Sequence, residues 1–70
     1  MSYSTVQFFK RTLLEDFREH HIPITREFLL QLLAVNKQYK TKTSRMLTQA
    51  IEEIWQDTFD CKILEIEQNV

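Results

Sequence analysis

The chain has 70 residues, a formal net charge of −1 and a single cysteine, Cys61, so a disulfide within the chain is excluded. A domain of this length buries only about 60% of the surface that its unfolded chain exposes, so we expect a second subunit to contribute to stability. Glycine is absent, and P-loops, dinucleotide-binding turns and nucleophile elbows depend on glycine. No apolar run has the length of a membrane span or signal peptide, so we expect a cytoplasmic protein with no membrane partner.

Candidate catalytic and metal-binding residues are few. His20 and His21 are adjacent, so their side chains would diverge on a helix or a strand and would not form a metal site with Cys61. No base, nucleophile and orienting group occur at a known catalytic spacing. We therefore expect a binding protein rather than an enzyme, with no cofactor, no metal and no small-molecule substrate.

The first predicted helix runs from about residue 5 to residue 19. Ser4 and Gln7 have the spacing of a capping box, in which each side chain accepts a hydrogen bond from the backbone N–H of the other residue. Apolar residues then recur every three or four positions, which predicts one stripe that faces a core: Val6, Phe9, Leu13 and Phe17.

A short extended segment is predicted at residues 21–24, because Pro23 cannot continue a helix and favours an extended residue before it. Thr25 is the expected N-cap of a second helix, from about residue 26 to residue 39. Residues 28–35 are apolar except for Gln31, so this helix needs cover on several sides. We expect that cover from a second copy, through an interface that also includes the third helix: Phe28, Leu29, Leu32, Leu33, Leu47 and Ile51.

A third helix is predicted from about residue 44 to residue 58, with Thr43 or Ser44 as its N-cap. One of its faces is apolar: Met46, Leu47, Ala50, Ile51, Ile54 and Trp55. The tail at residues 62–67 carries β-branched residues with partial alternation, which favours a short strand or an extended arm, with a frayed helix as the alternative. The sequence thus predicts one mainly α domain over residues 1–70.

Positive charge is concentrated between the second and third predicted helices. Lys37, Lys40, Lys42 and Arg45 fall within a stretch that contains no acidic residue. Together with Ser44 they lie at the predicted start of the third helix, where free N–H groups and the helix dipole favour an anion such as a DNA phosphate. The alternative is that these cations only solvate the end of one helix and the connection that follows it.

Residues 22–55 resemble the ribbon-helix-helix family of dimeric DNA-binding repressors and antitoxins. Ile22 and Ile24 stand where the family has its short strand, and residues 44–54 follow its second helix, which opens with Ser and continues apolar-apolar-x-x-Ala-apolar. The resemblance implies an intertwined homodimer whose paired strands lie in the major groove of double-stranded DNA. His21 would then face outward from the ribbon.

We therefore expect a small dimeric nucleic-acid-binding regulator, of repressor or antitoxin type, that contacts DNA through Lys37, Lys40, Lys42, Ser44, Arg45 and His21. In a helix-turn-helix variant of the same class, the third helix would be the recognition helix and would present Arg45, Thr48, Gln49 and Glu52 outward. The alternative function is a helical protein-interaction module, such as an adaptor, inhibitor or assembly factor, that does not bind nucleic acid. The net charge near zero favours this alternative.

Overall fold

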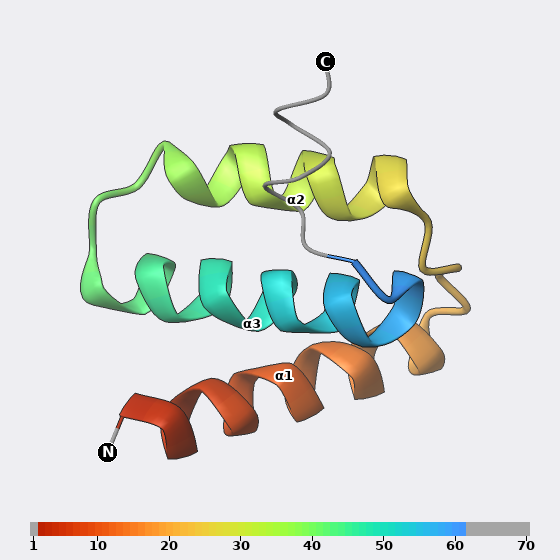
Figure 1. Ribbon diagram of the computed structural model, residues 1–70, viewed down its shortest axis with the longest axis horizontal. Helices are drawn as coiled ribbons and strands as arrows, with labels where there is room; N and C mark the ends of the chain where they lie inside the picture. The colour runs from red at the N-terminus through yellow and green to blue at the C-terminus, as the bar shows by residue number, and fades with distance from the viewer. Residues whose placement is uncertain (1, 62–70) are drawn as a thin grey trace.

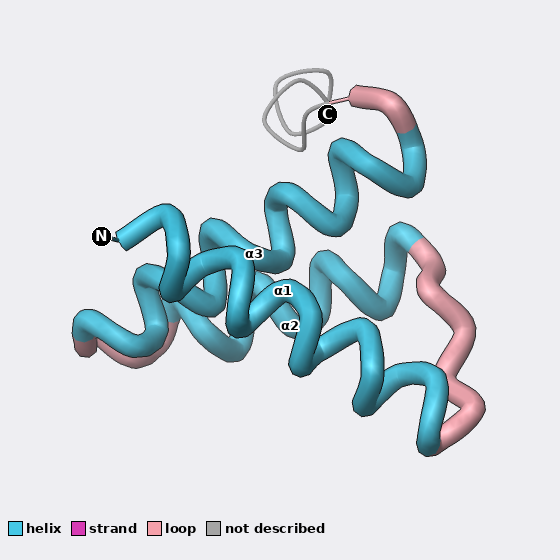
Figure 2. The backbone as a smooth tube through the Cα atoms, turned by 90° about the horizontal axis from the view of Figure 1, so that it is seen from below, coloured by secondary structure: helices cyan, strands magenta, loops and turns pink. Residues whose placement is uncertain are grey.

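The computed structural model describes residues 2–61, and their side chains from residue 4 onward. It consists of three helices, α1 (Ser2–Glu19), α2 (Arg26–Lys37) and α3 (Lys42–Phe59). α3 lies in the middle, with α1 and α2 packed on either side of it, and the chain reverses at each connection so that α2 runs opposite to its neighbours (Figure 1). Seen from below, α1 runs obliquely to α3 (Figure 2). The mainly α prediction is confirmed for residues 2–61, which contain no strand, and the strand predicted at 62–67 lies outside the described residues.

The core forms where the apolar faces of the three helices meet. Its buried apolar side chains come from all of them: Val6, Phe17, Leu29, Leu33, Ala50, Ile51, Ile54 and Trp55. α1 and α2 meet near their connection, where the rings of Phe17 and Phe28 pack edge to face with centroids 5.2 Å apart. At the same end of the molecule, the Trp55 ring packs edge to face on Phe59 with centroids 5.1 Å apart. The apolar faces predicted for the first and third helices therefore point into a shared core.

α1 begins earlier than predicted. Its first helical residue is Ser2, so Ser4 lies within the helix and does not act as its N-cap. Gln7, the predicted partner of Ser4 in a capping box, instead donates from Nε2 to Glu53 Oε1 on α3 at 3.0 Å. The prediction of the capping box is therefore wrong, because Gln7 bonds to another helix rather than to the start of its own.

The other two helices begin at threonine caps. Thr25 caps α2 as predicted, and its Oγ1 accepts a hydrogen bond from the backbone N–H of Phe28 at 3.1 Å. The predicted N-cap of α3, Thr43 or Ser44, is wrong by two or three residues, because Thr41 is the N-cap and Lys42 is the first helical residue. Thr41 Oγ1 accepts from the backbone N–H of Ser44 at 3.1 Å.

The segment predicted to be extended, residues 21–24, is not extended at its first residue. His21 has a φ of 55°, in the left-handed region. Its backbone N–H donates to Arg18 O at 3.2 Å, and that of Ile22 donates to Phe17 O at 2.8 Å. This bond pattern closes a helix in a Schellman motif, so the prediction of extended backbone at His21 is wrong. Residues 22–24 have no regular secondary structure, and a ribbon strand there, which would pair with a second copy, stays a prediction.

The residues expected to form a dimer interface fall into two groups. Leu29, Leu33 and Ile51 are fully buried within one subunit, because α2 and α3 cover each other on this side. Their burial therefore does not require a second copy. The other three, Phe28, Leu32 and Leu47, are partly buried in the single chain. The homodimer itself stays a prediction.

Candidate nucleic-acid interface

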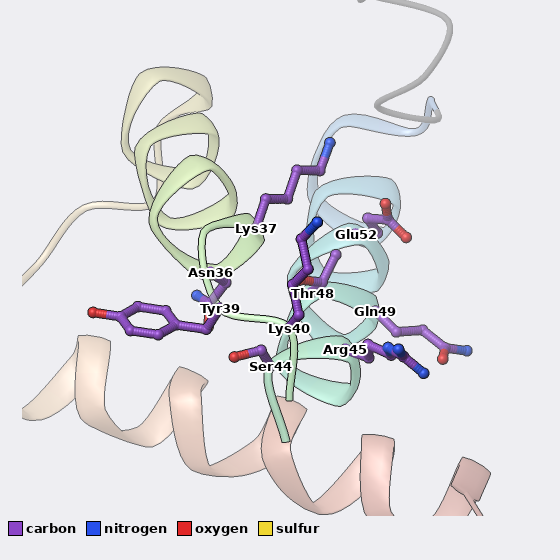
Figure 3. Close-up of a pocket in the computed structure, with 9 residues that line it drawn as sticks. All are labelled: Asn36, Lys37, Tyr39, Lys40, Ser44, Arg45, Thr48, Gln49 and Glu52. Carbon is purple, nitrogen blue, oxygen red and sulfur yellow. The ribbon is translucent and has the colours of Figure 1, made fainter. Parts of the chain in front are cut away.

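The end of α2, the turn after it and the first half of α3 enclose an open groove with a volume of about 560 Å³. We call this hollow the basic groove, because three of its nine lining residues are cationic and one is acidic. The lining residues are shown in Figure 3: Asn36, Lys37, Tyr39, Lys40, Ser44, Arg45, Thr48, Gln49 and Glu52. The structure thus brings four of the predicted nucleic-acid-binding residues together: Lys37, Lys40, Ser44 and Arg45.

The cations of the basic groove come from three successive segments. Lys37 is the last residue of α2, Lys40 lies in the turn, and Arg45 lies in the first turn of α3. All three side chains are exposed. Lys37 and Lys40 extend in a similar direction, whereas Arg45 projects from the outer side of α3 (Figure 3). The three positive charges are therefore not gathered at one point.

One face of α3 supplies the polar floor of the groove. Arg45, Thr48, Gln49 and Glu52 are spaced by three, one and three residues, which places them on the same side of a helix. This is the face that the helix-turn-helix variant predicted to point outward. The core face of the same helix lies on its other side and includes the buried Ile51.

Ser44 lines the groove but is only 7% exposed. Its backbone N–H donates to Thr41 Oγ1 at 3.1 Å, and its Oγ accepts from Thr41 Oγ1 at 3.0 Å. The backbone N–H that the sequence offered to a phosphate is therefore already used in the cap of α3. A phosphate contact through this N–H would have to replace the cap.

Two predicted nucleic-acid-binding residues lie apart from the groove. Lys42 is exposed at the start of α3 but does not line the groove. His21 is in the α1–α2 connection, which leads into the N-terminal end of α2, whereas the groove is at its C-terminal end. Residues 26–35 of α2, about 15 Å of helix, lie between this connection and the first residue of the basic groove, Asn36.

Sequence reasoning missed two residues of the groove. Asn36 is held in the last turn of α2, where its Nδ2 donates to Leu32 O at 2.9 Å. Tyr39 is 59% exposed and points away from Arg45 and Gln49 (Figure 3). The signal that could have found Tyr39 is an aromatic residue between lysines in a polar connection, a pattern typical of nucleic-acid-binding surfaces.

The acids of α3 that face α1 take part in contacts between these two helices. Lys10 of α1 pairs with Asp57, and its Nζ lies 3.8 Å from Glu53 Oε1. Glu53 also accepts the hydrogen bond from Gln7. These two acids contact α1, and neither of them lines the basic groove.

Two other features, a metal-binding cluster and a membrane-spanning helix, are absent from the part of the chain that the structure describes. Residues 2–61 contain no group of three or more His, Cys, Asp or Glu side chains that could hold a metal ion. None of the helices there has the length and apolar character needed to cross a membrane.

The chain matches no protein-family model, no curated protein and no solved structure in comparisons with each. The likeness of residues 22–55 to the ribbon-helix-helix family therefore stays a prediction.

Proposed function

We propose that this chain is a small dimeric nucleic-acid-binding regulator, of repressor or antitoxin type, that contacts the phosphates of double-stranded DNA through the basic groove. The observation that carries the proposal is that Lys37, Lys40 and Arg45 all line one groove beside α3. A cation that neutralises a phosphate releases condensed counterions, and this release supplies most of the affinity that does not depend on base sequence.

The polar floor of the groove suits the same ligand. Thr48 and Gln49 follow Arg45 by about one helical turn. A hydroxyl and an amide donate and accept hydrogen bonds, so they can bind phosphate and sugar oxygens or base edges. Glu52 lies one turn further on, where its carboxylate would repel a phosphate but could accept from a cytosine amino group. We therefore expect the DNA phosphates to lie beside the cations of the groove, and we expect no phosphate contact at Glu52.

The charge distribution around α3 supports this ligand as well. The net charge of −1 would repel DNA if it were spread evenly over the surface. Two of the acids on α3, Glu53 and Asp57, are instead drawn toward Lys10 on the α1 flank. The potential of the basic groove is therefore more positive than the net charge suggests.

The test is a mobility-shift titration of the full chain with mixed-sequence duplex DNA over a range of salt concentrations. If each of the three cations meets one phosphate, log affinity should fall against log salt with a slope of about −0.9 per contact, or about −5 for a dimer. Replacing Lys37, Lys40 and Arg45 with Ala should remove most of that slope and leave the helical content unchanged. A slope that survives the triple substitution would place the DNA contacts elsewhere.

A second candidate function is a helical protein-interaction module of the adaptor, inhibitor or assembly-factor kind. It is supported by exposed apolar side chains on two helices, because Phe8 of α1 is 61% exposed and Val35 of α2 is 51% exposed. The net charge near zero favours it too. A folded chain that shifts no DNA at low salt would favour this candidate over the first.

A further inference from the structure

The outer surface of α2 carries four exposed residues in a regular pattern. Glu27, Leu30, Ala34 and Lys37 are spaced by three, four and three residues, and all four are exposed. This is the a/d spacing of a helix that packs along a second helix. The two central residues are apolar and the two outer residues carry opposite charges. We call these four residues the α2 seam.

We propose that the α2 seam binds the α2 seam of a second copy of this chain, with the two helices antiparallel about a twofold axis. A twofold axis midway between Leu30 and Ala34 places each residue of the seam opposite a defined residue of the other copy. Leu30 then lies against Ala34 of the partner subunit, and Glu27 lies against Lys37 of the partner subunit. Symmetry repeats both contacts, so two ion pairs flank an apolar centre.

Charge complementarity selects this partner and this orientation. An acid at one end of the seam and a base at the other are self-complementary only when the helices run in opposite directions. In a parallel pair, Glu27 would face Glu27 and Lys37 would face Lys37, and like charges across an interface are unfavourable. The small side chain of Ala34 also leaves room for Leu30 of the partner subunit, as a knob requires a hole.

The position of α2 in the fold permits this contact. α3 covers the inner side of α2, where Leu29 and Leu33 are buried, and the seam lies on an exposed flank beside this inner side. Leu30 is 36% exposed, so one short helix offers a small apolar area. Interfaces of that size are typical of weak association, and we expect a dissociation constant in the micromolar range or above.

The inference deepens the dimeric part of the proposed function, and it places the two basic grooves in a defined relation. The grooves lie at the C-terminal ends of two antiparallel helices, so they occupy opposite ends of the helix pair. Lys37 belongs to both the seam and the groove. A substitution of Lys37 could therefore change both self-association and DNA binding. For this reason the dimer test is done without nucleic acid, so that a failure to dimerise is distinguishable from a failure to bind DNA.

The test is sedimentation velocity of the full chain, with charge reversals at the two ends of the seam. The wild-type chain should associate at high micromolar concentration. Glu27→Lys alone and Lys37→Glu alone should each weaken self-association on the order of tenfold, because both ion pairs become like-charge contacts. An equimolar mixture of the two variants should recover the wild-type association, since each mixed dimer again pairs a lysine with a glutamate at both ends of the seam.

Recovery in the mixture is the decisive observation. Glu27 and Lys37 lie in the first and last turns of α2, where their charges also favour the helix dipole. A variant that merely loses helix stability would not recover on mixing. Two controls on α1, Glu15→Lys and Arg11→Glu, change the net charge by the same amounts at exposed positions. A monomeric wild-type chain, a mixture no more associated than its components, or controls that weaken association equally would each overturn the proposal.

Discussion

The two flanks of α3 use charge in different ways. On the α1 flank, Lys10 and Gln7 reach across to Glu53 and Asp57, so charged and polar groups connect two helices. On the α2 flank, the two helices are held together by buried apolar side chains, and the cations stand at the surface around the basic groove. The α1 flank therefore uses charge in contacts between helices, whereas the α2 flank carries its cations at exposed positions beside a groove.

The largest expected effect concerns the apolar contact of the α2 flank. Leu29 is fully buried against α3, so Leu29→Ala should lower the free energy of unfolding by about 2–5 kcal/mol through lost burial and a residual cavity. Urea denaturation followed by circular dichroism measures this change. Gln31→Ala is the control on the same helix, because Gln31 is exposed and its loss should change stability by less than about 0.5 kcal/mol. Equal effects of the two substitutions would mean that α2 does not pack on α3 through this face.

A smaller effect is expected at the turn that leads into α3. Thr41→Ala removes the side chain that caps the helix and should lower the free energy of unfolding by about 1 kcal/mol. Thr43→Ala changes the same side chain two residues later, at an exposed position inside the helix, and should have little effect. A comparison of the melting temperatures of the two variants shows which of the two threonines caps α3. A larger loss for Thr43→Ala would show that α3 begins where the sequence alone suggested.

The smallest effect is expected on the α1 flank. Lys10→Ala removes two partly exposed ion pairs, and such pairs contribute roughly 0.2–1 kcal/mol each before screening by salt. The destabilisation should therefore shrink as the salt concentration rises. DNA binding should keep its salt slope, since Lys10 does not line the basic groove. A reduced salt slope in this variant would contradict the separation of the two flanks.

The regular part of the fold could be predicted from the sequence. Apolar residues at helical spacing identified the three helices, and Thr25 was correctly placed as a cap. The cap of α3 was misplaced because hydroxyl residues at 41, 43 and 44 all suit that role, and the choice depends on where the turn ends. His21 was misread because a chain without glycine gives no signal for a left-handed residue at a helix end.

The sequence predicted which segment carries the candidate site, but it did not predict which residues of that segment line the groove. The run of cations in the sequence pointed to the α2–α3 turn, yet it did not separate Lys40, which lines the groove, from Lys42, which does not. The contacts of Lys10 with α3 join residues more than 40 positions apart, so no local pattern could reveal them. These facts depend on how the helices pack against one another.

The most direct test of the proposed function compares two lysines that are neighbours in the sequence. Lys40→Ala and Lys42→Ala remove the same charge, but only Lys40 lines the basic groove. In a salt titration of binding to duplex DNA, Lys40→Ala should reduce the slope by about 0.9 for each subunit that contacts DNA, and Lys42→Ala should leave it nearly unchanged. Equal loss for the two variants, or no binding by the wild-type chain at low salt, would contradict a DNA-binding role for the basic groove.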